Sequence, residues 1–149
     1  ADQVRSGALP EPGHVVVPAG SGGTASGLAL GFALAGLPIR TVGVIVTEHL
    51  RLDESAMRKL AGKSARLLRE RGAEFPEPEL NLEMTSDWLG ETYGAPTPES
   101  GRAMELALED DLDLDPVYTA KAMAALLDGY GSGRFGDRPI LFINTNGPR

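Results

Sequence analysis

The chain has 149 residues, of which 42% are hydrophobic and 23% are charged, and its net charge is −7. This composition predicts one globular domain and argues against nucleic acid or an anionic membrane surface as the main partner, because both are bound by clustered Lys and Arg. The sequence holds no Cys and only two His, which excludes disulfides and thiolate chemistry and makes a zinc site unexpected. With no long apolar run and no signal-peptide core, we expect a cytoplasmic protein without a membrane partner.

The first third of the chain predicts a β-α-β unit over residues 14–47. Residues 14–17 are a short apolar run bounded by Gly and Pro, as expected of a strand buried on both faces. Residues 28–35 follow as an apolar helical pattern, and residues 40–47 are rich in β-branched side chains. Two strands joined in this way lie parallel and side by side.

A glycine-rich loop lies between the first predicted strand and the helix, at residues 18–27. Its centre reads Gly20, Ser21, Gly22, Gly23 and Thr24. Glycines let the backbone approach a ligand closely, and the free N–H groups at a helix start attract negative charge. The two hydroxyls add further donors, so the loop predicts an anion site, with phosphate as the first expectation.

The loop by itself leaves three alternatives open. Residues 20–25 fit a dinucleotide fingerprint, and Glu48 follows the next strand where a ribose-binding acid is expected, which would suit an NAD(P)-binding domain. A Walker loop fits less well, because no Lys follows the glycines. The third alternative is a tight turn that binds nothing.

The middle of the chain predicts one amphipathic helix and then irregular structure. Asp53 is placed to cap a helix that runs through Leu68, presents a heavily charged, solvated outer face and is ended by Gly72. Residues 75–82 hold two prolines, which indicates a connection or an edge strand. Residues 84–98 predict a long irregular loop, and loops of this length in a compact domain often carry function.

Two helices are predicted in the last third. Thr97, followed by Pro98 and Glu99, has the signature of an N-cap and first turn for a helix through Leu108. Asp115 and Pro116 repeat that signature, and we expect the second helix to stop at Gly129.

The chain closes with a buried strand and a polar segment. Residues 140–143 are fully apolar, and residues 144–148 read Asn-Thr-Asn-Gly-Pro. Because α/β proteins bind ligands at the carboxyl ends of their strands, this segment is a second candidate for the ligand site.

Several blocks together resemble one known family. They are the glycine loop, the Thr-Tyr-Gly-Ala-Pro of residues 92–96, the Leu-Asp-Pro-Val-Tyr-Thr-Ala-Lys-Ala-Met-Ala of residues 114–124, and residues 138–145. In order and spacing they resemble the C-terminal half of fold type II pyridoxal-phosphate (PLP) enzymes, in the branch of D-cysteine desulfhydrase and 1-aminocyclopropane-1-carboxylate (ACC) deaminase. The resemblance implies that residues 1–149 form part of the large domain, a three-layer α/β/α fold with a mostly parallel sheet.

The resemblance also implies roles for the loop and for two tyrosines. The residues at the cofactor phosphate would be Gly20, Ser21, Gly22, Gly23 and Thr24. Tyr118 would lie beside the cofactor and take part in catalysis, and Tyr93 would lie near the substrate. Without the resemblance, both tyrosines would be read as core or rim residues with satisfied hydroxyls.

Two threonines bear on the reaction. Thr119 stands where ACC deaminase has a Glu near the pyridine nitrogen of the cofactor, and a hydroxyl can donate only to a neutral nitrogen. The weaker electron sink suits β-elimination better than opening of a cyclopropane ring. Thr145 also resembles the desulfhydrase side of the branch. The resemblance therefore implies a lyase or deaminase for a small amino acid such as D-cysteine, yielding keto acid, ammonia and sulfide.

The family's Schiff-base lysine belongs to an N-terminal half that this chain lacks. Lys59 and Lys63 lie on the charged helix, and Lys121 is a motif position that the family does not use for this purpose. We therefore expect this chain alone to be inactive, its partner to be the missing half of the same enzyme, and the whole to form a homo-oligomer. A non-catalytic fragment or binding module remains the further alternative.

Overall fold

A computed structural model describes residues 1–145, and its centre is a parallel sheet. Within these residues the sheet has four strands in the order β3-β2-β1-β4. Every neighbouring pair is parallel, and His14 lies beside Arg40 on one side and Ile140 on the other. The strands are β1 (His14–Ala19), β2 (Arg40–Ile45), β3 (Leu82–Thr85) and β4 (Ile140–Phe142). The predicted residues 144–148 lie partly outside the described residues.

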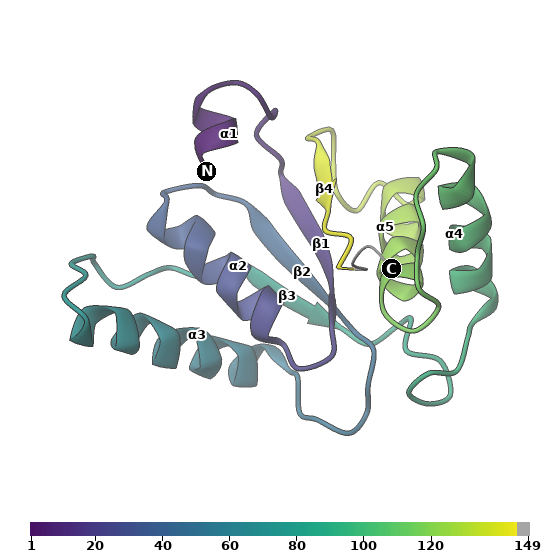
Figure 1. Ribbon diagram of the computed structural model, residues 1–149, viewed down its shortest axis with the longest axis horizontal. Coiled ribbons are helices and arrows are strands. Elements are labelled where there is room, and N and C mark those ends of the chain that lie inside the picture. Colours follow the sequence, from purple (N-terminus) through teal and green to yellow (C-terminus); the bar gives the residue numbers. More distant parts are fainter. Residues whose placement is uncertain (146–149) are drawn as a thin grey trace.

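Helices cover both faces of this sheet. In Figure 1, α2 (Gly23–Leu34) and α3 (Glu54–Glu70) lie on one side, and α4 (Pro98–Glu109) and α5 (Thr119–Gly131) lie on the other. Successive residues of β1 alternate between the two layers: Val16 packs with residues of α4 and α5, and Val17 with residues of α2 and α3. A short helix, α1 (Asp2–Arg5), precedes the sheet. The predicted three-layer α/β/α fold is confirmed.

The predicted caps of α3 and α4 are confirmed. The Asp53 carboxylate accepts the N–H of Ala56 at 2.8 Å. Thr97 and Ser100 form a reciprocal capping box, in which each side chain accepts the other's backbone N–H. Local sequence therefore specifies where both helices begin.

The start of α5 differs from the prediction. Tyr118 occupies the N-cap position, and the helix begins at Thr119. Asp115 lies one turn earlier, where its carboxylate accepts the N–H groups of Val117, Tyr118 and Thr119 at 3.0, 2.7 and 3.0 Å. The acid that was expected to cap the helix instead caps the turn that leads into it.

Two other boundaries also differ. Gly129 does not end α5, which continues to Gly131. A Cβ atom at Gly129 would lie 2.4 Å from the Phe135 ring, so this glycine makes room for the aromatic side chain. Strand β3 begins where residues 75–82 were expected to end and takes in the first residues of the expected loop, because Leu82–Thr85 pair with residues 41–44 of β2.

None of the helices in the described part of the chain is long and apolar enough to cross a membrane.

Gly22 combines two constraints that a side chain would violate. Its φ is +79°, and a Cβ atom there would lie 2.0 Å from the Met57 sulfur. We expect Gly22→Ala to lower the free energy of unfolding by about 1–3 kcal/mol, since left-handed backbone and a clash both add strain. Thermal unfolding checks this, at about 2–4 °C per kcal/mol for a chain of this size.

Gly27→Ala is the matched control for this variant. Gly27 lies inside α2 with open space around its Cβ position, so alanine there is expected to stabilise the helix by about 0.5–1 kcal/mol. Equal melting temperatures for the two variants would contradict the account of Gly22.

Candidate functional site

The glycine loop joins the carboxyl end of β1 to the amino end of α2. Gly22 occupies the N-cap position in a left-handed conformation, and no side chain of the described residues caps the helix. The first helical hydrogen bond runs from the Ser26 N–H to the Gly22 carbonyl at 2.9 Å. The N–H groups of the first turn before Ser26 therefore have no partner within the helix and form a local centre of positive potential.

A hollow of about 410 Å³ opens beside this loop. Its lining comes from the glycine loop, the turn before α5 and the segment after β4, and consists of Pro18, Gly20, Ser21, Thr24, Tyr118 and Thr145. None of these side chains is charged, and three carry aliphatic hydroxyls. A concave surface with neutral donors next to a helix amino end fits the phosphate group of a cofactor.

The ring of Tyr118 rests against the backbone of Gly20. A Cβ atom at Gly20 would lie 2.7 Å from the Tyr118 ring, so only glycine leaves room for the ring there. The Tyr118 hydroxyl lies 2.8 Å from the Tyr93 hydroxyl, and the two rings meet edge to face. The hydrogen bond to Tyr93 raises the pKa of Tyr118, and partial burial raises it further, so the phenol stays protonated at neutral pH.

Glu48 binds the loop that carries Tyr93 through both oxygens of its carboxylate. The Thr92 hydroxyl donates to one Glu48 carboxylate oxygen at 2.6 Å, and the Tyr93 N–H donates to the other at 2.8 Å. The Thr92 hydrogen bond is the main reason why the pKa of Glu48 lies below its ordinary value. Both oxygens accept hydrogen bonds from this loop, so in this structure Glu48 holds the loop.

Thr119 is placed differently from the other predicted residues. Its side chain is fully buried. Its hydroxyl donates to the Asp115 carboxylate at 2.7 Å, and the hydroxyl oxygen also accepts the Asp115 N–H at 2.8 Å. Burial raises the pKa of Asp115, but the hydrogen bonds from Thr119 and the neighbouring backbone outweigh it, so this pKa lies below its usual value. Thr119 thus belongs to the Asp115 turn and does not line the hollow.

The structure gathers most of the predicted site residues in one place. The predicted residues that line the hollow are Gly20, Ser21, Thr24, Tyr118 and Thr145. Tyr93 joins them through its hydroxyl. Gly22 faces Met57 instead, Gly23 is the first residue of α2, and Thr119 bonds to Asp115.

Two residues of the site escaped the sequence analysis. Glu48 was interpreted only as a ribose ligand, and its partners are 44 and 45 residues away in the sequence. Lys121 was set aside, yet its ammonium group donates to the Leu89 carbonyl at 2.5 Å, 32 residues away. No local pattern signals either contact; the one clue is that Glu48 lies three residues past the end of β2.

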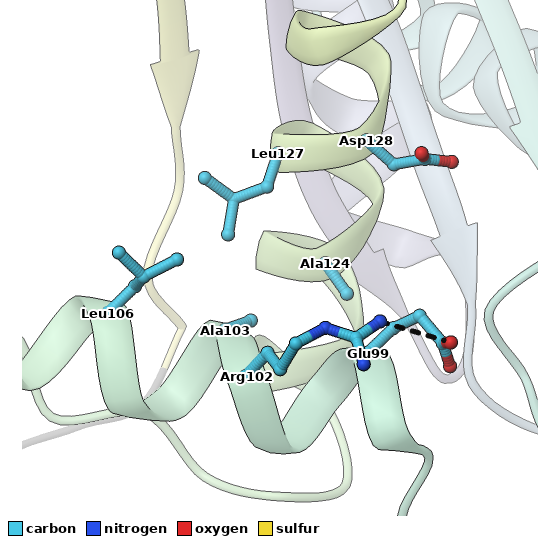
Figure 2. A pocket seen from close by; sticks show the side chains of 7 residues that line it. All are labelled: Glu99, Arg102, Ala103, Leu106, Ala124, Leu127 and Asp128. Carbon is cyan, nitrogen blue, oxygen red and sulfur yellow. Dashed lines mark hydrogen bonds and ion pairs between the residues drawn. The ribbon is translucent and has the colours of Figure 1, made fainter.

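A second hollow, of about 440 Å³, lies between α4 and α5 (Figure 2). Leu106, Leu127 and two alanines form its apolar part, and Glu99 and Arg102 pair with each other at 3.3 Å along its rim. Among residues 1–145, its lining comes from these two helices. Two of its three charged side chains are the acids Glu99 and Asp128, and Arg102 already pairs with Glu99, so this hollow suits an anion less well than the glycine loop does.

Comparison with known proteins assigns the family. Residues 2–146 match the family described as "Pyridoxal-phosphate dependent enzyme". The chain belongs to that family. It is 34% identical over 142 residues to a D-cysteine desulfhydrase of Klebsiella pneumoniae (strain 342), a match that covers 92% of this chain and 40% of the relative. The resemblance expected from the sequence is confirmed.

A solved structure supports the same assignment. It is described as that of an ACC deaminase homologue, and it superposes with a TM-score of 0.81 at 32% identity, covering 97% of this chain and 42% of the other. The chain therefore spans about two-fifths of the length of these relatives. Members of this family depend on pyridoxal phosphate, in agreement with the neutral donors and helix amino end beside the hollow at the glycine loop.

The Asp115 carboxylate allows a pH-dependent test of what stabilises the turn before α5. In the folded chain the pKa of Asp115 lies below the ordinary 3.8, so between these two values the unfolded state binds more protons than the folded state. The contribution of Asp115 to stability is therefore present above pH 3.8 and is lost as the pH falls through the pKa of the folded chain. We expect Asp115→Asn to lower the unfolding free energy by about 1–3 kcal/mol at pH 7. The difference from the wild type should shrink at pH 3.

Urea unfolding at pH 7 and pH 3 measures both effects. Asp137→Asn, at an exposed carboxylate, is the control and should change stability little. A deficit of Asp115→Asn that is as large at pH 3 as at pH 7 would contradict the role given to the ionised carboxylate.

Proposed function

We propose that this chain is the C-terminal part of a PLP-dependent lyase acting on a small amino acid with a leaving group at Cβ, such as D-cysteine. The products would be a keto acid, ammonia and sulfide. One observation carries the proposal: in a chain of this family, the glycine loop, Tyr118 and Thr145 line a single hollow. The D-cysteine desulfhydrase relative supports the choice of substrate.

The hollow suits the phosphate group of the cofactor. We assign that group to the backbone of Gly20, Gly22 and Gly23 and to the hydroxyls of Ser21 and Thr24. On a chain with a net charge of −7, an anion needs local donors, and the amino end of α2 supplies them. When bound, PLP would supply the electron sink for the carbanion formed at the substrate Cα.

The tyrosine pair is the acid–base element of this site. One phenol of the pair donates to the other across 2.8 Å, which leaves the remaining proton free for a substrate atom. Either phenol can be the donor of this hydrogen bond, and when Tyr93 donates, the Tyr118 proton is the free one. We assign to Tyr118, with Tyr93 beside it, the delivery of a proton to the departing sulfur.

Thr119 and Thr145 are proposed to contact the cofactor ring. The Thr119 hydroxyl has one hydrogen, which points to Asp115 in this structure. Donation to the pyridine nitrogen would require that hydrogen to leave the Asp115 carboxylate. Thr145 is exposed and lines the hollow, so its hydroxyl is available without such a change.

The Schiff-base lysine is proposed to lie in the rest of the enzyme. Lys59 and Lys63 are on α3 and are not among the described residues that line the glycine-loop hollow. Lys121 is fully buried, and its Nζ donates to the Leu89 carbonyl. The remaining three-fifths of the relatives' length would supply the lysine and the substrate-carboxylate site. Assembly of two or more copies is the expected state of the complete enzyme.

The proposal is tested on the complete enzyme that contains this chain, loaded with PLP. We expect release of keto acid and ammonia from D-cysteine, with D-serine, cysteate and ACC tested alongside. Replacing Ser21 and Thr24 together by Ala should raise the Kd for PLP roughly tenfold or more, because hydrogen bonds to a charged group are strong.

Ser64→Ala is the control for the double variant. Ser64 is an exposed serine on α3 whose hydroxyl donates to the Leu60 carbonyl, so its loss should leave PLP affinity unchanged. If none of the four compounds yields keto acid or ammonia, the lyase assignment is wrong. If PLP binds equally well to the double variant, the phosphate is held elsewhere.

A further inference from the structure

The loop that carries Tyr93, residues 86–97, contains neither helix nor strand. Trp88 anchors its beginning in the core, and Thr97 ends it as the cap of α4. Between these points, the internal backbone bonds are short-range, such as that from the Ala95 N–H to the Thr92 carbonyl. Such bonds shape a turn, but they do not fix its position relative to the sheet.

Glu48 connects this loop to the sheet. It follows β2 closely, after the buried residues Val46 and Thr47, and the Val46 N–H donates to the Ala19 carbonyl at the end of β1. The carboxylate is therefore carried by a backbone that is joined to the glycine loop. From there it accepts the Thr92 hydroxyl and the Tyr93 N–H, which fixes the backbone of Tyr93 itself.

Lys121 connects the same loop to α5. It is the third residue of that helix and is fully shielded from solvent, and its ammonium group donates to the Leu89 carbonyl. Burial lowers the pKa of Lys121, and the Glu48 carboxylate opposes that shift. A shielded cation gains from a counter-charge, and Glu48 is the acidic group that opposes the lowering of the Lys121 pKa.

We propose that Glu48 and Lys121 are positioning residues that clamp residues 86–97 from two elements and thereby set the Tyr93 hydroxyl against the Tyr118 hydroxyl. For its catalytic meaning this inference rests on the proposed function. Tyr93 is 42% exposed, so packing alone does not hold its ring. The clamp fixes the position of Tyr93. On the other side of the hydroxyl pair, the contact with Gly20 fixes the position of the Tyr118 ring.

The first test measures amide hydrogen exchange on the 149-residue chain at pH 7, without cofactor or substrate. Glu48→Ala should speed exchange in residues 90–96 roughly tenfold, because the Tyr93 N–H loses its acceptor, and exchange in β1 should stay unchanged. Glu48→Gln keeps one acceptor oxygen and should restore part of the protection. Lys121→Met, which keeps the bulk but removes the ammonium group, should speed exchange in residues 86–96.

Two controls separate the clamp from general loosening. Glu91→Ala removes an exposed carboxylate of the same loop and should leave exchange unchanged. Tyr93→Phe removes the hydroxyl pair but keeps the N–H bond to Glu48, so it should leave the protection of residues 90–96 intact. Unchanged exchange in Glu48→Ala would overturn the clamp, and unchanged exchange in Lys121→Met would overturn the part given to Lys121.

The second test follows tyrosine ionisation by absorbance near 295 nm. The sequence has three tyrosines, so a Tyr130→Phe background leaves only the pair. Tyr93 and Asp115 are the charged or titratable groups that raise the pKa of Tyr118. Glu48→Ala should therefore move the upper transition towards ordinary tyrosine, as Tyr93→Phe does, whereas Glu91→Ala should not. An unmoved transition would show that Glu48 does not set the hydroxyl pair.

The complete enzyme separates this inference from the proposed function. Glu48→Ala should lower kcat with D-cysteine while the Kd for PLP stays unchanged, and Glu48→Gln should recover part of kcat. An enzyme that does not turn over D-cysteine would refute the proposed function but leave the exchange and ionisation results standing. Normal kcat in Glu48→Ala would overturn the positioning role.

Discussion

The carboxylate of Asp115 is the contact on which the site geometry depends. By accepting three successive N–H groups and the Thr119 hydroxyl, it fixes the turn before α5 and so the direction in which Tyr118 leaves the backbone. The Thr119 side chain, which donates to this carboxylate, is fully buried. Tyr118 can then lie over Gly20 only because that position has no side chain, and this contact joins the two halves of the hollow.

The two carboxylates near the site are held by hydrogen bonds from the protein. Glu48 and Asp115 both have lowered pKa values, since each accepts hydrogen bonds in its folded setting. Neither lines the hollow; their oxygens point at N–H and O–H groups of the protein. The nearby carboxylates accept hydrogen bonds from the protein and do not face the hollow. An acidic chain can in this way still offer an anion neutral donors and a helix amino end.

Local sequence predicted what depends on local interactions. The glycine loop, the caps at Asp53 and Thr97 and the parallel sheet were predicted correctly, because turns, caps and strand-helix alternation are short-range features. The boundary at Gly129 was wrong because a tertiary contact with Phe135 uses that glycine. Glu48 and Lys121 gained no correct role for a similar reason: their partners are brought near only by the sheet and by α5.

The arrangement also shows how the proposed work would be divided. The described chain gathers hydroxyls, a helix amino end and two phenols at the carboxyl edge of its sheet, which suits holding phosphate and moving protons. Lys121 is unsuited to bonding the cofactor, since it is buried and already bonded to Leu89. Lys59 and Lys63 are on α3 and are not among the described residues that line the hollow. A chain that spans two-fifths of its relatives would therefore contribute the cofactor cradle and the acid, and its activity would require the nucleophilic amine to come from the remaining part.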